Sequence, residues 1–386
     1  MKLLPYACSS AFSMGRLHHE QTSENVCPFQ QDRNRVHYST AFRRLEYKTQ
    51  VFINYIGDHY RTRLTHSLEV SQIARDVCRQ LGLNEDLAEA IALSHDIGHP
   101  PFGHAGEDGL NIAMKKFGGF NHNAQTIKVL TVLEHRYIGF RGVNLTWGTI
   151  EGVAKHNGPL LSSQKGQDQI QVLLQGYVEK FSGRMDTYPS LEAQVASIAD
   201  DIAYCCHDID DGLRAGFFTL ETLEELPAIW AIITGIMEQY SQISQTQLIN
   251  EAIRRIAKFM SDDLLCESNR RIANSKIKDY QDVQEQTIAL IGFSKHMEAT
   301  KNALKKFLMH RVYRHHKINQ ISYKSRLVVQ KLFEVLYANP DCLPGEWVGK
   351  IISDSHKAEV IKDYIAGMTD RYALKLHASF NGNSDF

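Results

Sequence analysis

Four side chains of types that bind metals come from three separate segments of the sequence. They are His66, the adjacent pair His95-Asp96, and Asp200. Imidazoles and carboxylates that converge from distant segments can hold a hydrolytic divalent metal and leave coordination positions open for water and substrate. One inward histidine by itself is more often a hydrogen-bonded core residue, so the inference depends on the whole set. The set predicts a metal-dependent phosphohydrolase.

The first two segments have the apolar spacing of helices. Over residues 64–81 the apolar positions recur at intervals of three and four, and His66 falls on the same stripe, facing the core. The next segment has Asn84 as a candidate cap and ends before Gly98, which leaves His95-Asp96 at a helix end. Successive side chains at a helix end can diverge around one ion.

A third helix is expected to start at Ser190 and to run past Asp208. Its apolar face is separate from a face on which three polar residues follow at intervals of four: Asp200, Tyr204 and Asp208. Residues 226–243 and 303–313 also have helical patterns, 157–167 resemble a polar surface loop, and strands are hard to place. The predicted fold is all-α, with an irregular segment at 1–30, a catalytic core at 31–220 and a C-terminal helical region at 221–386.

The composition restricts the possible partners and location. With 43 basic and 44 acidic residues the net charge is -1, so no global field draws the chain to nucleic acid or membrane, and a polyanion needs a local basic pocket. The seven cysteines show no CxxC spacing, which favours reduced thiols and a cytoplasmic protein. Pro5 interrupts a short apolar start, and no stretch reaches the ~18 apolar residues of a membrane span, so neither export nor membrane insertion is expected.

Longer runs around these residues resemble a known family. His66, His95-Asp96 and Asp200 are similar to the H…HD…D pattern of the HD-domain phosphohydrolases, and the closer resemblance is to the deoxyguanosine triphosphate triphosphohydrolases. The similarity is dense over 31–216 and looser at 311–315. The runs that carry it are 40–45, 48–52, 62–67, 92–104, 155–159, 199–204 and 207–212.

This resemblance implies a reaction and a cofactor. Water would attack the α-phosphorus of a deoxynucleoside triphosphate and release the deoxynucleoside and intact tripolyphosphate. One divalent metal would be held by His66, His95, Asp96 and Asp200. Nitrogen and oxygen ligands suit manganese, magnesium, iron, nickel or zinc alike, so the ion stays open. The proton donor would be His104, with Glu107 orienting its ring and His122 completing the relay.

The resemblance also implies substrate contacts. Arg63 would touch the α-phosphate, and Lys305 would bind the phosphate tail. The sugar contacts implied are Gln50, Tyr204, Asp208 and Tyr313. Simpler alternatives stay open: Tyr204 as a core residue, Glu107 as a solvated first-turn acid, and the basic run at 305–316 as a solvated helix face or a strip that touches nucleic acid.

Relatives of this kind imply partners as well. A homo-oligomer, as a hexamer or smaller ring, is expected, together with a second nucleotide as activator and a single-stranded DNA effector. Two rival functions remain. One is an HD-type phosphohydrolase that acts on another nucleotide phosphoester, and the other is a regulator that binds nucleotides or nucleic acid without turnover.

Overall fold

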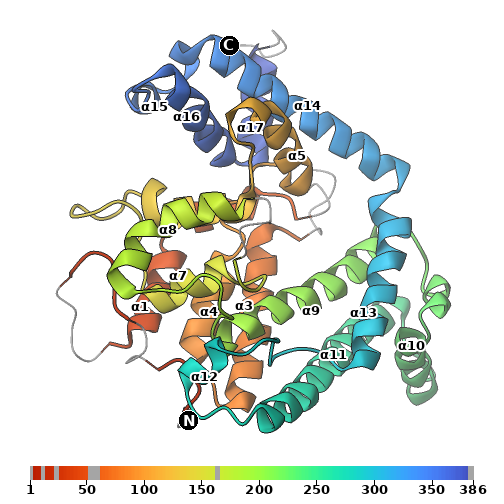
Figure 1. Cartoon of the computed structure of the whole chain (residues 1–386). Coiled ribbons are helices and arrows are strands. Elements are labelled where there is room, and N and C mark those ends of the chain that lie inside the picture. Colours follow the sequence, from red (N-terminus) through yellow and green to blue (C-terminus); the bar gives the residue numbers. More distant parts are fainter. Residues whose placement is uncertain (1–2, 10–13, 21–25, 51–60, 161–165, 381–386) are drawn as a thin grey trace.

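The computed structural model is built from helices (Figure 1) and describes residues 3–9, 14–20, 26–50, 61–160 and 166–380. Within these residues the extended backbone forms isolated bridges and no sheet, which confirms the all-α prediction. No helix in this part of the chain is both long and apolar enough to cross a bilayer. The α-helices are α1 (Pro28–His37), α2 (Thr40–Arg44), α3 (Arg63–Leu81), α4 (Glu85–Ser94), α5 (Gly103–Ala113), α6 (His122–Lys128), α7 (Trp147–Ala154), α8 (Gln167–Phe181), α9 (Leu191–Arg214), α10 (Pro227–Gln239), α11 (Gln245–Ser275), α12 (Tyr280–Gln284), α13 (Lys295–Leu308), α14 (His316–Ala338), α15 (Gly345–Val348), α16 (Asp354–Ala366) and α17 (Asp370–Phe380).

Three helices at the centre of the molecule carry the predicted metal ligands. α3, α4 and α9 pack against one another, with α1 and α7 against α4 and α11 against α3 and α9. Their apolar faces join one large buried cluster that includes Val70, Ile91 and Ile202. Because close-packed interiors resist small displacements, side chains that project from these three helices are held in fixed relative positions.

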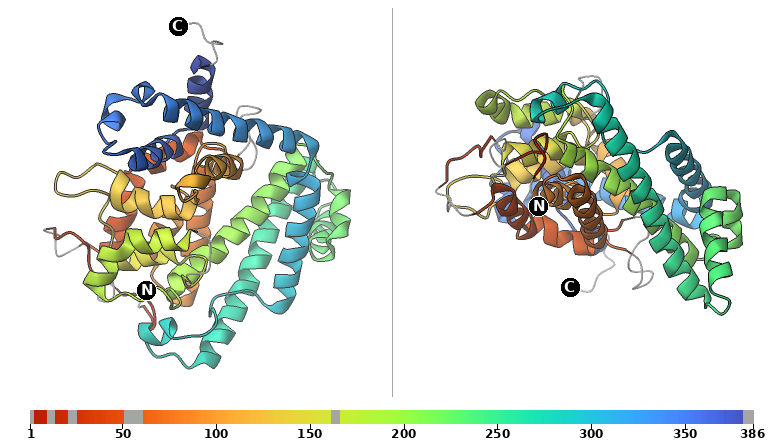
Figure 2. Two further views of the ribbon diagram at one scale, coloured as in Figure 1. Left: turned by 45° about the horizontal axis from the view of Figure 1, so that its top comes forward. Right: turned by 90° about the horizontal axis from the view of Figure 1, so that it is seen from below.

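A second, smaller apolar cluster lies beside the first. It joins α5 to the C-terminal helices α14, α16 and α17 through residues such as Leu110, Leu332 and Ile361. α14 is the long helix that leads from the region of α13 to that of α15 and α16 (Figures 1 and 2). The C-terminal half of the chain is therefore divided between the two clusters: α10, α11 and α13 join the first, and α14, α16 and α17 the second.

The ends of α3, α4 and α9 follow capping rules. Thr62 caps α3 in a capping box with Thr65, and Gly82 ends that helix in the left-handed conformation. Asn84 caps α4, as predicted, and α9 begins at Leu191 with Ser190, the predicted start of the helix, as its cap. The predicted starts of all three helices therefore agree with the structure to within a residue.

Two predicted C-terminal helices end differently. α10 stops at Gln239 and does not extend to residue 243, and its cap residue Tyr240 has an extended backbone. The segment 303–313, which was predicted as helical, is the end of α13 followed by a π-helix over Met309–Tyr313. Of the predicted loop at 157–167, positions 161–165 lie outside the described residues, as do Val51 and Phe52 of the run at 48–52.

Asp370, the first residue of α17, connects the C-terminal helices to the segments that contain Thr49 and Phe102. Its buried carboxylate accepts hydrogen bonds from the backbone N–H and the hydroxyl of Thr49 and from the backbone N–H of Phe102. Phe102 is the residue from which α5 begins. One side chain thus holds two segments that the sequence analysis assigned to substrate binding and catalysis.

Replacing Asp370 with alanine is expected to lower the free energy of unfolding by about 1–3 kcal/mol, because two buried N–H groups lose their acceptor. Thermal denaturation of the metal-free protein measures the change as a lower Tm. Asp341→Ala removes an exposed acid from the same half of the chain and should change stability by less than about 0.5 kcal/mol. Equal melting temperatures for the two variants would contradict this role of Asp370.

Candidate active site

The predicted metal ligands lie together between α3, the end of α4 and α9. Donor atoms of His66, His95 and Asp96 all lie within 4.8 Å of one another. Asp200 completes the set, because its Oδ1 is 2.9 Å from His66 Nε2 and 3.7 Å from His95 Nε2. The first three side chains are buried, and that of Asp200 is 38% exposed. These four residues, called the metal set below, are therefore accessible on the Asp200 side.

His95 is oriented as a metal ligand should be. Its Nδ1–H donates to the backbone carbonyl of Ala92, 2.6 Å away, which leaves Nε2 with the free lone pair. That Nε2 atom is buried and has no hydrogen-bond partner. A buried polar atom without a partner is costly, and a cation is the partner that this atom fits. The residues of this chain therefore fit a divalent metal.

The charges of the centre also suit a cation. Burial opposes ionisation of Asp200, but the neighbouring imidazoles of His66 and His95 outweigh it and lower the pKa of Asp200 to about 2. Burial likewise opposes the charged form of His95, but Asp96 and Asp200 outweigh it and raise the pKa of His95. Two carboxylates thus create a negative potential that stabilises positive charge at this point.

Arg63 is packed against the metal set. Its guanidinium donates to Asp96 Oδ2 at 2.6 Å, and the side chain is buried. Arg63 was predicted to contact a phosphate. In this structure it contacts the carboxylate of Asp96, which is a predicted metal ligand. A planar guanidinium has five donors, so one can hold Asp96 while others remain for a phosphate oxygen. Its Nε is buried without a partner.

Hydrogen bonds from side chains on two sides hold the turn that carries His95-Asp96 in place. Thr126 of α6 accepts from the backbone N–H of Gly98 and donates to the carbonyl of His95. A Cβ at Gly98 would lie 2.2 Å from the backbone nitrogen of Thr126, so only glycine fits there. Lys48 donates to the carbonyl of His99 from the other side. These contacts fix the ligand pair by means that do not depend on a metal.

A second cluster of imidazoles lies next to the metal set. Glu107 Oε2 is 3.2 Å from His104 Nδ1, and Glu107 Oε1 is 2.8 Å from His122 Nδ1. Burial opposes the charge of Glu107, but hydrogen bonds from His104 and His122 hold its pKa well below the usual value. Glu107 is thus mostly buried and bonded to both rings, unlike the solvated acid of the simpler alternative. The side chain of His104 is 70% exposed, which leaves its other nitrogen open to a ligand.

His99 connects the two groups. Its Nδ1 lies 3.1 Å from Asp96 Oδ1, and its ring packs at 3.9 Å, centroid to centroid, against His122. His99, His104, Glu107 and His122 together also have donor atoms close enough to hold an ion. The ring of His99 is fully buried, and burial together with Arg63 and His122 lowers its pKa well below the usual value. His99 is therefore neutral and leaves the charge of the centre negative.

The backbone that leads into α5 brings His104 close to the metal set. Phe102 and Gly103 both have positive φ, at 66° and 55°. This conformation is strained for Phe102 but not for glycine, and strained backbone is often found at functional sites. A Cβ at Gly103 would lie 2.8 Å from Arg63 Nη2 and 3.3 Å from the carbonyl oxygen of Gln50. Only glycine lets these two predicted substrate contacts approach the start of α5 so closely.

Three of the four predicted sugar contacts have hydrogen-bonding capacity that no protein group in the described residues uses. Gln50 Oε1, Asp208 Oδ2 and Tyr313 Oη are all buried without hydrogen-bond partners. The rings of Tyr204 and Tyr313 stack at 6.2 Å with an angle of 18° between their planes. Burial, with Asp211 adding to it, raises the pKa of Asp208 well above the usual value. Buried polar atoms without partners are uncommon, and each of these three could form a hydrogen bond with a polar ligand.

Lys305 does not face the metal set directly. It donates to Asp201 Oδ1 at 2.6 Å, and Lys301 donates to the other oxygen of the same carboxylate. Asp201 follows Asp200 in α9, so the two ammonium groups lie on the neighbouring residue. A phosphate would have to compete with Asp201 for Lys305.

Two residues beside the metal set were missed by the sequence analysis. His207 Nδ1 is 3.3 Å from His66 Nδ1, and Glu69 accepts a hydrogen bond from His207 Nε2. Glu69 is three residues after His66, and His207 is seven residues, or two helical turns, after Asp200. Helical spacing from the predicted ligands was therefore a signal that could have found both.

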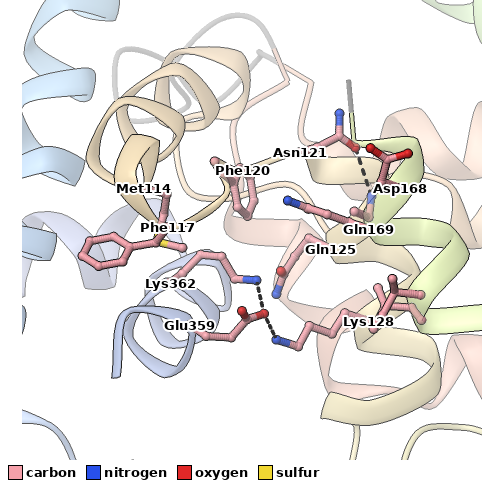
Figure 3. Close-up of a pocket in the computed structure, with 14 residues that line it drawn as sticks. Met114, Phe117, Phe120, Asn121, Gln125, Lys128, Asp168, Gln169, Glu359 and Lys362 are labelled. Carbon is pink, nitrogen blue, oxygen red and sulfur yellow. Dashed lines mark hydrogen bonds and ion pairs between the residues drawn. The ribbon is translucent and has the colours of Figure 1, made fainter. Parts of the chain in front are cut away.

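One cavity of the described residues lies away from the predicted site. It has a volume of about 300 Å³ and lies between α6, α8 and α16, with Phe117 and Phe120 at its wall (Figure 3). None of the predicted site residues lines it. Its two lysines, Lys128 and Lys362, are both paired with acids, Glu359 and Asp363. Because its cations are neutralised, this cavity lacks the free positive charge that a polyphosphate needs.

Known proteins match this chain along almost its whole length. The HD domain model matches residues 63–205, and that of a phosphohydrolase-associated domain matches 291–379. Deoxyguanosinetriphosphate triphosphohydrolase-like proteins of Brucella suis, Parvibaculum lavamentivorans and Bradyrhizobium diazoefficiens are 48%, 46% and 46% identical to it. Each alignment covers 97% of this chain and 94%, 95% and 95% of the relatives. These matches confirm the resemblance that the sequence runs indicated. The chain belongs to the deoxyguanosinetriphosphate triphosphohydrolase-like family of HD-domain phosphohydrolases.

Proposed function

We propose that the protein hydrolyses deoxynucleoside triphosphates to the deoxynucleoside and tripolyphosphate. The observation that carries the proposal is the pair of adjoining clusters: a buried set of cation ligands with an orphaned imidazole nitrogen, and an exposed imidazole backed by a carboxylate. The relatives' names, which refer to deoxyguanosine triphosphate, support the nucleotide as substrate.

A divalent metal fits His66, His95, Asp96 and Asp200, and when bound it would neutralise phosphate charge and activate water. Asp96 is kept ionised there: burial opposes its charge, but His95, His99 and Arg63 outweigh it and hold its pKa well below the usual value. Arg63 holds Asp96 in place and offers its remaining donors to the α-phosphate.

His104 is the proposed general acid. Glu107 accepts from its Nδ1–H, which leaves Nε2–H of the protonated ring to protonate the departing 5'-oxygen of the nucleoside. The same carboxylate holds His122, so the two rings keep a fixed relation to each other. Because His104 is exposed and Glu107 is mostly buried, the acid can reach substrate while its partner stays rigid.

The deoxynucleoside would lie against Tyr204. Asp208 Oδ2 can accept a hydrogen bond from the 3'-hydroxyl, and a ring packed under C2' would exclude a ribose hydroxyl by steric clash. Gln50 and Tyr313 offer further unpaired polar atoms for the sugar. Lys305 would leave Asp201 and bind the phosphate tail. It would thereby supply the local positive charge that the net charge of the chain does not provide.

The wider expectations belong to the same proposal. A cytoplasmic homo-oligomer, as a hexamer or smaller ring, a second nucleotide as activator and a single-stranded DNA effector are all consistent with the family. The basic run at 305–316 includes the exposed residues His310 and Arg311, which such an effector could meet.

Product analysis with dGTP tests the proposal. We expect equimolar deoxyguanosine and tripolyphosphate from purified protein supplied in turn with each candidate metal, and the same assay on all four dNTPs gives the base preference. Release of pyrophosphate or orthophosphate in place of tripolyphosphate would indicate the rival phosphoesterase. Binding of dGTP by the metal-loaded protein without any product would indicate the regulator.

A further inference from the structure

Behind the ligand His66, three side chains form a continuous line of contacts that leads to the surface. His66 Nδ1 lies 3.3 Å from Nδ1 of His207, and Nε2 of His207 contacts a carboxylate oxygen of Glu69. The side chain of His207 is 3% exposed and that of Glu69 is 48% exposed. The line therefore begins at a half-exposed acid and ends at a buried ligand.

The carboxylate at the outer end fixes every proton along this line. An ionised carboxylate only accepts, so His207 must carry its proton on Nε2. A neutral imidazole has one N–H, so Nδ1 of His207 is then an acceptor. The Nδ1 of His66 must therefore be the donor, because two lone pairs cannot face each other at that distance. Nε2 of His66 is left with its lone pair, and a cation bound by both Nε2 and Asp200 Oδ1, which are 2.9 Å apart, would separate that lone pair from the carboxylate.

Arg61 supports the outer end of this line. Its Nε lies 3.7 Å from Oε1 of Glu69, so a cation lies beside the carboxylate. Arg61 is itself anchored on Asp210 and Asp211 of α9. The outer end of the line, at Glu69, is thus connected through Arg61 to α9, the helix that carries Asp200.

The two histidine ligands are consequently fixed in different ways. The backbone carbonyl of Ala92 holds the proton of His95 on Nδ1, and no side-chain substitution can remove that acceptor. For His66 the equivalent acceptor is the side chain of His207. Partners of this kind set the tautomer of a metal ligand, and their loss commonly weakens metal affinity by about 10- to 100-fold.

We propose that His207 and Glu69 are positioning residues that keep the proton of His66 on Nδ1 and present its Nε2 to the metal. This inference rests on the proposed function in assuming that His66 is a metal ligand. It assigns a role to two residues that have no part in the phosphate or sugar contacts described above.

Binding of Mn²⁺ to the metal-free full-length protein, followed by the electron paramagnetic resonance of the free ion, tests the proposal without an activity assay. His207→Leu should raise the Kd about 10- to 100-fold. His207→Asn should stay within about threefold of the wild type, because its Oδ1 can accept near the position of Nδ1. Glu69→Ala should raise the Kd by about tenfold, at the lower end of the range because water can reach this position.

Asp76→Ala is the matched control for Glu69→Ala. Asp76 lies on the same helix, its side chain is 49% exposed, and it pairs with Arg79 away from the metal set. Its variant should bind Mn²⁺ as the wild type does. Because Glu69 is half-exposed, Glu69→Ala tests the line even if His207→Leu fails to fold.

Three outcomes would overturn the proposal. They are unchanged Mn²⁺ affinity in His207→Leu and Glu69→Ala, equal losses in His207→Leu and His207→Asn, and equal losses in Glu69→Ala and Asp76→Ala. His66→Ala separates this failure from failure of the metal site itself. If His66→Ala loses Mn²⁺ while His207→Leu does not, only the positioning role is wrong. If His66→Ala keeps Mn²⁺, the proposed metal site is wrong and the positioning role falls with it.

Discussion

Asp200→Ala and His95→Ala are expected to abolish both metal binding and hydrolysis of dGTP. Each removes a donor that faces the common centre, and His95 Nε2 has no other partner there. The loss of affinity should exceed the roughly 10- to 100-fold that loss of a supporting residue costs. Metal content after dialysis, measured by mass spectrometry, and turnover of dGTP give the two readouts.

Asp201→Ala is a control for Asp200→Ala, because the neighbouring carboxylate faces Lys301 and Lys305 and not the imidazoles. It should keep its full metal content, although it frees Lys305 and can change the KM for dGTP. Near-normal turnover in Asp200→Ala would contradict the metal centre. A folded, metal-loaded Asp200→Ala variant without turnover would instead make Asp200 a substrate contact.

Local physical rules were enough to predict the helices that carry the ligands. The apolar stripe through His66, the Asn84 cap and the start of α9 after Ser190 all depend on short-range spacing and capping, which the sequence shows directly. The convergence of three segments at one point is a tertiary property, and periodicity alone cannot give it. The prediction of convergence depended on the chemistry that the residue types share.

Other features were beyond such rules. The π-helix at Met309–Tyr313 places Tyr313 on Tyr204, and the pattern of 303–313 is equally compatible with a continued α-helix. The association of α5 with α14, α16 and α17 joins residues more than 200 positions apart in the chain. A single sequence gives no information about contacts over such a separation. Glu69 and His207 lie at helical spacing from the predicted ligands, but spacing alone does not show that their side chains contact each other and His66.

The roles of the site residues need a test that separates acid catalysis from metal binding, and His104 offers the clearest one. His104→Ala should keep its metal and lose about 10²- to 10⁴-fold in kcat for dGTP, the usual contribution of a general acid. The side chain is 70% exposed and packs little, so the variant should fold and melt as the wild type does. Metal content and Tm are therefore internal controls.

The leaving group decides whether the lost rate belongs to proton donation. The 5'-oxygen of a nucleoside is strongly basic and needs a proton as it departs, whereas 4-nitrophenolate leaves without one. With 4-nitrophenyl triphosphate as substrate, the difference between wild type and His104→Ala should shrink to less than about tenfold. Equal losses on both substrates would show that His104 positions the phosphate instead, and loss of the metal would place it among the ligands, with His99, Glu107 and His122 as its partners.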